Sequence, residues 1–392
     1  MGKRLLVITP VPEGGAGFRY RIQQYLPFLA AEGIDVCVRP FYSERLFELV
    51  LRPHALGKRA LLFAERAARR LAQLATLGGF DGVFLYREAF PLGPPWWEWV
   101  CAKGWRKPII FDFDDAIFLG DTSDTNRFLR GLKWPSRVGE ILRWSRHVIA
   151  GNSFLASYAR TYQPAVSVIP SSIDTERFRP RGRNTRETSE PLVIGWIGTP
   201  TTAKYLQSLD GVFRQLARQH AFTVKVVGAG YALPMSGVRL DERPWDLARE
   251  VEEFATCDIG VYPMWDDAWS RGKCGLKALQ FMACGVPVVA ARVGMNCEII
   301  EEGANGLLAA SDSEWVAALS RLLDDSSLRQ RLGQAGRETV EARYSLAVNA
   351  PKFVRVINGL WETYGAEEIH ADGSMATAAD AVPAALAMGA RG

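Results

Sequence analysis

The sequence predicts an α/β protein built from two doubly wound domains, each with a parallel sheet between layers of helices. Near the N-terminus, the continuous apolar run Leu5–Thr9 precedes a glycine loop, a helical stretch and a second strand, which is the order of a right-handed crossover unit. A polar, aperiodic stretch at 181–191 precedes another apolar run at 192–198, where we expect a second sheet to begin. The 392 residues suffice for two domains of ordinary size.

The composition and net charge limit the kinds of ligand and partner that we expect. Apolar residues make up 48% of the chain and charged residues 23%, which is typical of globular proteins. The net charge of +4 suits an anionic nucleotide or a phosphorylated lipid surface, and without a nucleic-acid motif we expect no nucleic-acid partner. The six cysteines show no Cys-x-x-Cys spacing, so we expect free thiols in the cytoplasm, with no metal. We see no signal peptide and no apolar run of the ~20 residues that a membrane span needs.

The first glycine loop, residues 12–19, holds the pair Gly14 and Gly15 but not the Gly-x-Gly-x-x-Gly pattern of dinucleotide sites. A helix is predicted over 20–31 and a strand over 34–39. Arg19 follows the glycines directly, where it either binds an anionic substrate or is an ordinary surface arginine.

An arginine- and alanine-rich helix is predicted at 56–77. It either lies on an anionic membrane surface or packs on the sheet with its arginines in water. Strands are predicted next at 82–86 and 108–115.

Three carboxylates end the second of these strands. Asp112 and Asp114 fall on one face of an extended chain, and Asp115 follows. Open α/β sheets place ligand sites at such strand ends. The alternative is structural: one of the carboxylates caps the next helix or pairs with an arginine.

The stretch 273–291 is the most informative in the chain. It predicts a glycine turn, a helix, a Gly-Val-Pro break and a buried strand. Lys273, Lys277 and Gln280 share one helical face with Cys284, and Gly275 opens the helix. Unsatisfied N–H groups and two ammonium groups at a helix start can hold a pyrophosphate, whereas the plain alternative is a solvated lysine face.

Two segments resemble a known family. Gln280-Phe-Met-Ala-Cys-Gly-Val-Pro-Val-Val-Ala290 and Val166-Ser-Val-Ile-Pro-Ser-Ser-Ile-Asp-Thr-Glu-Arg-Phe-Arg-Pro180 are similar to the signature segments of the retaining GT-B glycosyltransferases of the large family-four type, the glycosyl transferases group 1. The chain departs from the pattern where the family has two glutamates, because Gly272 and Gln280 stand there. Those departures raise the question of whether activity is reduced or lost.

The resemblance implies a role for each candidate residue. Lys204 would grip the donor diphosphate, with Lys273, Gly275, Lys277 and Gln280 completing the donor site. Asp114 and Asp115 fall on the family's His-Asp positions near the transferred sugar and are the catalytic candidates. Gly14, Gly15, Arg19 and Asp112 would line the acceptor or sugar cleft. An Asp-x-Asp string is also the metal signature of the GT-A fold, but the order of the later motifs is that of GT-B, so no metal is expected.

The resemblance also implies a domain plan and an activity. We expect an acceptor-side domain at 1–180, a linker at 181–191, a nucleotide-sugar domain at 192–343, a helix at 344–364 that returns to the first domain, and a disordered tail at 365–392. The implied reaction moves a sugar with retention from a nucleotide diphosphate sugar to a saccharide or lipid-linked acceptor in cell-surface glycan biosynthesis. No cofactor is expected beyond this co-substrate, and the location would be the cytoplasm, with a peripheral contact at the inner face of the membrane as a further expectation. The alternatives are a nucleotide-sugar-binding protein without transferase activity and a nucleotide-sugar epimerase or hydrolase on the same fold.

Overall fold

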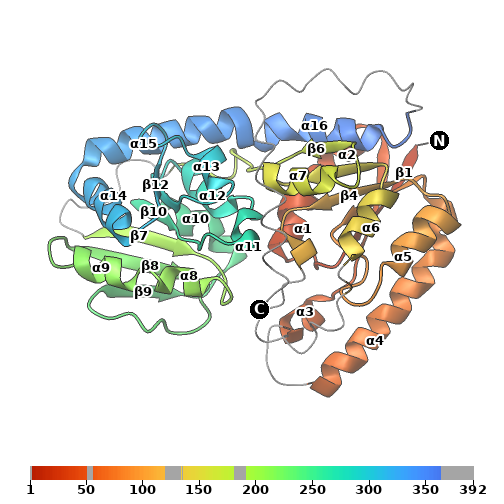
Figure 1. Ribbon diagram of the computed structural model, residues 1–392, viewed down its shortest axis with the longest axis horizontal. Helices are drawn as coiled ribbons and strands as arrows, with labels where there is room; N and C mark the ends of the chain where they lie inside the picture. The colour runs from red at the N-terminus through yellow and green to blue at the C-terminus, as the bar shows by residue number, and fades with distance from the viewer. Residues whose placement is uncertain (1, 51–55, 120–133, 135, 181–190, 363–392) are drawn as a thin grey trace.

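A computed structural model describes residues 2–50, 56–119, 134, 136–180 and 191–362. Two six-stranded sheets lie side by side, each covered by helices (Figure 1). The predicted linker, apart from residue 191, and the predicted tail lie outside the described residues. No helix in the described ranges is long and apolar enough to cross a membrane.

The first sheet has the strand order β2-β1-β3-β4-β5-β6, and all its neighbours are parallel. Its strands alternate their side chains between two apolar layers, because both faces are covered by helices. The strands are β1 (Lys3–Thr9), β2 (Ile34–Pro40), β3 (Gly82–Tyr86), β4 (Ile109–Phe113), β5 (His147–Ala150) and β6 (Val166–Val168). The helices are α1 (Ala16–Arg21), α2 (Leu26–Ala31), α3 (Glu44–Val50), α4 (Leu56–Ala72), α5 (Trp96–Trp99), α6 (Arg137–Trp144) and α7 (Ser153–Arg160).

The second sheet has the order β12-β11-β10-β7-β8-β9, again parallel throughout. Its strands are β7 (Leu192–Ile197), β8 (Phe222–Val227), β9 (Arg239–Arg243), β10 (Ile259–Tyr262), β11 (Val288–Ala291) and β12 (Leu307–Ala309). Its helices are α8 (Ala203–Gln207), α9 (Asp210–Leu216), α10 (Glu250–Ala255), α11 (Ala268–Arg271), α12 (Leu276–Ala283), α13 (Asn296–Ile299), α14 (Asp312–Asp324) and α15 (Ser326–Thr339). Both sheets have the α/β architecture that the sequence predicts.

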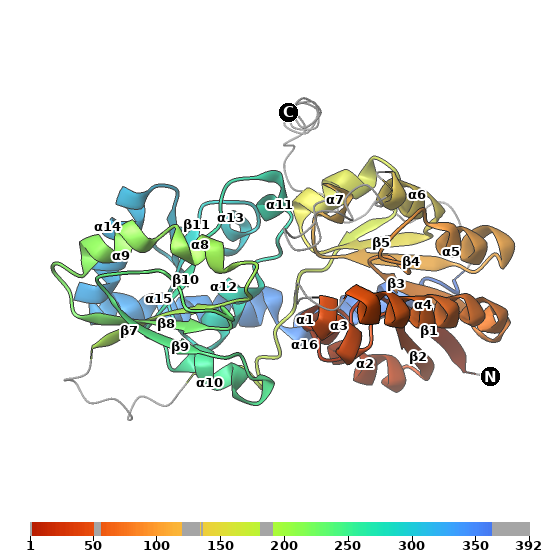
Figure 2. The ribbon, with the colours of Figure 1, turned by 90° about the horizontal axis from the view of Figure 1, so that it is seen from below.

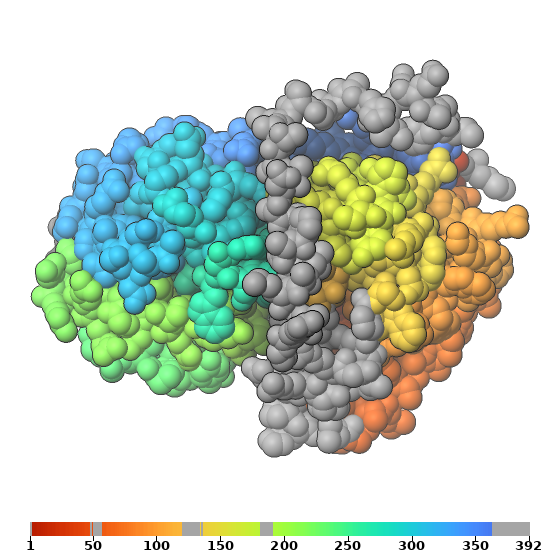
Figure 3. All heavy atoms as spheres, in the orientation of Figure 1, coloured from red at the N-terminus to blue at the C-terminus, as the bar shows by residue number. Residues whose placement is uncertain are grey.

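The chain crosses back to the first domain at its end. Helix α16 (Leu346–Asn358) continues the line of α15 across the top of both lobes, as the ribbon and space-filling views show (Figures 1 and 3). Its Phe353 stacks on Tyr25 at 4.1 Å between ring centroids. Ile173 of the first domain bonds the start of this helix. It donates its N–H to the carbonyl of Tyr344, and its own carbonyl accepts from the N–H of Leu346, both at 2.8 Å. The segment leaving the first domain and the segment returning to it are therefore hydrogen-bonded to each other.

The two domains share packed apolar surface. One buried cluster contains strand residues of the first sheet, such as Phe111, together with Phe281 and Met282 of α12. Phe178, from the last described segment of the first domain, packs edge-on against Phe254 of α10. Seen from below, α11 and α12 face the side of the first domain that carries α1 and α7 (Figure 2).

Two expectations about individual elements are wrong, and one strand was not expected. The helix expected at 20–31 is two helices, α1 and α2, separated by the 3-10 turn Gln23–Tyr25. Strand β9, which is polar and lies at a sheet edge, has no apolar run to reveal it. The arginines of α4 are not all in water, because Arg70 is only 1% exposed.

Candidate active site

Helix α12 begins in the manner that its glycine predicts. Gly275 is its N-cap with φ of 64°, a left-handed conformation that side chains other than glycine rarely adopt. A Cβ at this position would also lie 2.3 Å from Ile299 Cδ1. Because the first turn of a helix has N–H groups without intrahelical partners, this start offers hydrogen-bond donors between the domains.

Lys273, just before this turn, binds across to the first domain. Its Nζ donates to Asp115 Oδ1 at 2.7 Å, and the same ammonium lies 4.9 Å from the centroid of the Trp269 ring. Burial lowers the pKa of Lys273, but Asp115 raises it by more, so that the net pKa is above its ordinary value. Lys273 is therefore a fixed positive charge between the two domains.

Asp114 is held by the end of strand β3. It accepts hydrogen bonds from the Tyr86 hydroxyl at 2.8 Å and from Arg87 Nη2 at 2.7 Å, and Arg87 Nη2 also bonds Asp115 Oδ2. Burial raises the pKa of Asp114, whereas Arg87 and Arg21 lower it by more, so the carboxyl titrates below its usual range. Arg87 has φ of 58°, and a strained non-glycine residue of this kind persists where its surroundings hold it in place.

Asp112 is the most deeply placed of the three carboxylates. Its oxygens accept from Arg21 Nε at 3.0 Å and Arg21 Nη2 at 2.6 Å, and both side chains are at most 1% exposed. Arg21 Nη1 also donates to the Ile169 carbonyl at 2.8 Å. This is the arginine pairing that the sequence left open as the alternative for one of the carboxylates. The Arg21–Asp112 ion pair connects α1 to β4.

Arg19 makes a second connection between the domains. Its two terminal nitrogens donate to Glu250 at 2.8 and 3.1 Å, and Glu250 at the start of α10 is 1% exposed. Arg177 adds a further contact to Glu250 at 3.0 Å. Burial raises the pKa of Glu250, but Arg19, Lys277 and Arg177 together lower it by more, so the carboxyl titrates below its usual range. The positive charge of Arg19 is therefore balanced by a carboxylate of the second domain.

Lys277 and Gln280 lie on the buried side of α12. Lys277 Nζ donates to Gln280 Oε1 at 2.9 Å, and Gln280 Nε2 donates to the Tyr20 hydroxyl at 2.6 Å. Burial lowers the pKa of Lys277 to about 8. Its ammonium bonds a neutral amide rather than a carboxylate at hydrogen-bond distance, so an incoming anion would gain from this charge.

The two domains are in close contact around α11. A Cβ at Gly272 would lie 2.6 Å from Ala116 Cβ and 2.8 Å from its backbone N. In this arrangement position 272 has no room for a side chain, let alone the glutamate of the family pattern. On the same side, Cys274 Sγ donates to the Asp114 carbonyl at 3.2 Å, and Asn152 Nδ2 bonds the Lys273 carbonyl at 3.0 Å.

The glycine loop at 12–19 also lies close to the carboxylates. Gly14 N donates to Glu44 at 2.7 Å, and Gly15 is the N-cap of α1. A Cβ at Gly17 would lie 2.4 Å from the Tyr86 hydroxyl, which is the group that holds Asp114. The loop and the carboxylates therefore lie close together, as expected from their positions after parallel strands.

Lys204 is exposed at the surface of the short helix α8. Its ammonium lies 4.9 Å from the Trp265 ring centroid and 5.4 Å from that of Tyr205. The contacts that connect Lys273, Lys277 and Gln280 to the first domain do not include it.

Several residues of this site were not identified from the sequence. Tyr86 is the last residue of strand β3 and Arg87 follows it, so the strand-end rule that selected the aspartates could have found them. Glu250 gave no such signal, because its partner Arg19 is 231 positions away. Asn152 is the N-cap of α7, because its Oδ1 accepts from Leu155 N at 2.8 Å.

Charged groups of both domains meet at this contact. Lys273 is paired with Asp115, and Arg87 is paired with Asp114 and Asp115. Lys277, which bonds the neutral amide of Gln280, and the N–H groups at the start of α12 are the donors left for an anion. Among the described residues, no three His, Cys, Asp or Glu side chains are placed to hold a metal ion together.

Known proteins resemble this chain in sequence. Residues 191–325 match a family model described as glycosyl transferases group 1. D-inositol 3-phosphate glycosyltransferase 2 of Catenulispora acidiphila is 27% identical over 292 residues, covering 64% of this chain and 65% of that protein. The D-inositol 3-phosphate glycosyltransferase of Stackebrandtia nassauensis is 30% identical over 285 residues, covering 63% and 62%. The chain thus spans less than two thirds of the length of these curated relatives.

Solved structures resemble it in fold. Anabaena HepE, solved in complex with UDP and glucose, superposes with a TM-score of 0.66 at 15% identity, over 91% of this chain and 100% of that one. Sucrose-phosphate synthase from Thermosynechococcus elongatus superposes with a TM-score of 0.64 at 17% identity, over 92% and 99%. The predicted family resemblance is therefore confirmed, with a group 1 glycosyl transferase match over residues 191–325 and the GT-B fold over the two domains.

Proposed function

We propose that this protein is a glycosyltransferase that moves a sugar from a nucleotide diphosphate sugar to a saccharide or lipid-linked acceptor, with retention, in polysaccharide biosynthesis. The observation that carries the proposal is the charged contact between the domains. Lys273, which opens the donor-side turn, binds Asp115 at the end of the acceptor-side strand at 2.7 Å. Group transfer between two substrates needs such facing walls, because the donor and the attacking hydroxyl must meet.

On the donor side, we assign the diphosphate to the start of α12. Lys277 and the N–H groups after Gly275 would bind its oxygens, Lys273 would add charge, and Lys204 would approach from α8. Gln280 would contact the donor, as its place in the family signature implies. These groups would stabilise the negative charge that develops on the leaving diphosphate. Neither metal nor cofactor has a part in this scheme.

On the acceptor side, we assign the sugar cleft to the Gly14–Gly15 loop, Arg19 and the region above Asp112. Asp114 and Asp115 would lie beside the transferred sugar, where the ion pairs with Arg87 hold both side chains in place. A lipid-linked acceptor would bring the enzyme to the inner face of the membrane. The exposed leucines of the arginine-rich helix α4, Leu61 and Leu71, support that contact.

Product analysis with a labelled nucleotide sugar tests the proposal. Transfer of label to an added saccharide or lipid-linked acceptor supports it. Retention is read from the anomeric configuration of the product. Label that stays in unaltered donor identifies a binding protein, and label recovered in an isomeric nucleotide sugar or in free sugar identifies an epimerase or hydrolase. A thermal-stability screen of nucleoside diphosphates would find the base, because ligands that bind only the folded state raise its stability.

A further inference from the structure

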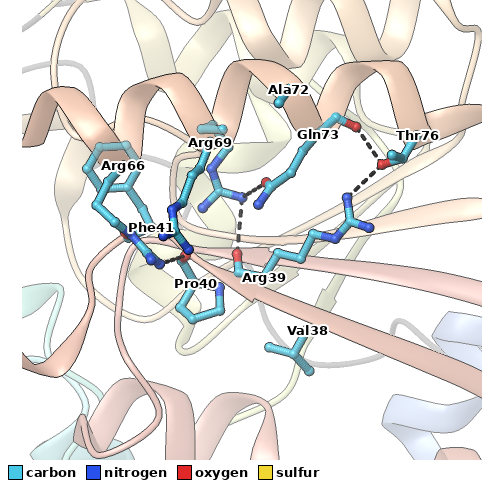
Figure 4. A pocket seen from close by; sticks show the side chains of 10 residues that line it. Val38, Arg39, Pro40, Phe41, Arg66, Arg69, Ala72, Gln73 and Thr76 are labelled. Carbon is cyan, nitrogen blue, oxygen red and sulfur yellow. Dashed lines mark hydrogen bonds between the residues drawn. The ribbon is translucent and has the colours of Figure 1, made fainter.

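A cavity of about 470 Å³ lies on the first domain, between the end of strand β2 and helix α4 (Figure 4). Four arginines line it, namely Arg39 from β2 and Arg66, Arg69 and Arg70 from α4. None of them belongs to the donor and acceptor assignments made above. The cavity therefore raises a separate question: which ligand would balance so much positive charge?

The guanidinium groups are bonded mostly to neutral acceptors. Arg66 donates to the carbonyls of Phe41 at 2.6 Å and Pro40 at 2.9 Å. Arg39 donates to the Thr76 hydroxyl at 2.7 Å. Only Arg69 pairs with a carboxylate, Glu65, in a contact that is largely exposed on both sides. Carbonyl and hydroxyl groups satisfy N–H donors but leave the positive charge unbalanced.

Arg70 gives a second and independent indication that the cavity takes an anionic ligand. It is 1% exposed, and its Nε has no hydrogen-bond partner, although Arg70 donates through its terminal nitrogens to the carbonyls of Arg39 at 3.0 Å and Thr9 at 3.2 Å. Burial lowers the pKa of Arg70 to about 9, against the attraction of Glu98. Glu98 Oε1 is itself bonded to Ala89 N at 2.8 Å.

A purely structural role accounts for part of this arrangement. Arg66 and Arg70 bind carbonyl groups that follow or end strands β1 and β2, which is a sound reason for both to be there. It does not account for the unpartnered Nε of Arg70, nor for Arg39 and Arg69 on the wall of the same cavity. A buried donor without a partner is costly, and guanidinium groups bind phosphate oxygens in paired, charge-assisted contacts.

We propose that this cavity binds a phosphate-type oxyanion, a phosphomonoester or a diphosphate, at a site distinct from the donor site. The ligand would lie between Arg39 and the arginines of α4, with the guanidinium groups of Arg39 and Arg69 as its donors and the charge of Arg70 beside them. Because Arg70 also binds the last carbonyl of β1, next to the glycine loop, an occupied site would stiffen the wall on which we place the acceptor.

The test uses full-length protein and two probes. Calorimetry measures binding of inorganic pyrophosphate, and sedimentation measures binding to phosphatidylcholine vesicles with and without phosphatidic acid. The variant R39Q/R69Q removes two cavity charges and spares the partly buried Arg66 and the buried Arg70, so the fold should persist. Lys58→Gln is the matched control, since Lys58 is exposed on the same helix and does not line the cavity.

We expect the double variant to weaken pyrophosphate binding about tenfold or more, with the control unchanged. In our assignment the donor site also binds diphosphate. The pyrophosphate binding that is lost in Lys277→Ala therefore measures the contribution of the donor site. The loss in Lys277→Ala and the loss in R39Q/R69Q should be independent of each other. A loss in the double variant seen only with phosphatidic acid vesicles would identify a lipid headgroup as the source of the phosphate. If R39Q/R69Q remains folded and binds both probes like the parent protein, the proposal is overturned.

Discussion

Lys273 Nζ lies 2.7 Å from Asp115 Oδ1, so a turn of the second domain and a strand end of the first share one ion pair. Arg87 connects this pair to Asp114 through the same Nη2 atom. The catalytic candidates and the donor-side lysine therefore form a single charged unit. A change in any one of these groups should alter how the domains meet as well as what they bind.

The donor diphosphate should depend on Lys204 and Lys277. Each contributes a charge-assisted contact of about 1–3 kcal/mol, so Lys204→Ala and Lys277→Ala should each weaken donor binding by about tenfold or more in calorimetry. Lys352→Ala, at an exposed position of α16, is the control. Unchanged affinity in both test variants would remove the diphosphate from this location.

Donor binding should depend on pH through Lys277. Because burial lowers the pKa of this ammonium to about 8, the free protein loses the charge above that pH. A bound diphosphate favours the charged form, so binding should take up a proton near pH 8 and weaken as the pH rises further. Calorimetry in buffers of different ionisation enthalpy measures the uptake. Proton uptake that persists in Lys277→Ala would assign the titration to another group.

The same lowered pKa predicts the sign of an effect on stability. Between about pH 8 and the ordinary lysine value of 10.5, the unfolded chain binds a proton at Lys277 and the folded chain does not. The contribution of Lys277 to stability therefore rises with pH in this window, and its burial is most costly below pH 8. Lys277→Met should raise Tm more at pH 7 than at pH 10. An equal shift at both values would contradict the assignment.

Transfer should proceed without a metal ion. Activity with purified donor and acceptor should survive EDTA, because lysines and helix N–H groups supply the counter-charge in our scheme. Activity that is lost in EDTA and restored by manganese or magnesium would instead make the aspartates metal ligands. Asp114→Asn should lower turnover and leave donor binding intact, which separates a role beside the sugar from a role in affinity.

Substitution of Arg19 tests whether this residue contributes to acceptor binding. Arg19→Ala should raise the KM for acceptor and leave donor binding unchanged. Glu250→Gln is the companion variant, because it weakens the Arg19 contact between domains and keeps the arginine itself. If both variants raise the acceptor KM equally, Arg19 acts through the interdomain bond. Loss of donor affinity in Arg19→Ala alone would move Arg19 to the diphosphate.

A glutamate introduced at position 272, where the family pattern has one, tests the close contact between the domains. Gly272→Glu should prevent the observed contact between domains, because a Cβ there would lie 2.8 Å from Ala116 N. Overpacking of this kind costs about 1–3 kcal/mol, so Tm should fall and small-angle scattering should show a larger radius of gyration. Gly211→Glu is the control, since a Cβ at Gly211 meets nothing within 4 Å.

The sequence predicted the α/β architecture because buried parallel strands leave continuous apolar runs, as in Leu5–Thr9. It predicted the turn at Gly275 because glycine and proline mark helix boundaries. It could not predict the pairs Arg19–Glu250 and Lys273–Asp115, since each joins residues more than 150 positions apart and depends on how two domains meet. Strand β9 was missed because its side chains are polar, whereas the strand-end rule, applied to β3, could have found Arg87.

The bonds of Ile173 to Tyr344 and Leu346 have a mechanical consequence. The two crossings of the chain between domains are fastened together at this point, so we expect the lobes to pivot about one narrow hinge. Arg177 follows shortly after Ile173 and bonds Glu250 at 3.0 Å, so the Arg19–Glu250 ion pair lies near this hinge. A rotation about the hinge would break the Lys273–Asp115 ion pair, and re-forming that pair would bring the two lobes back to the same relative position.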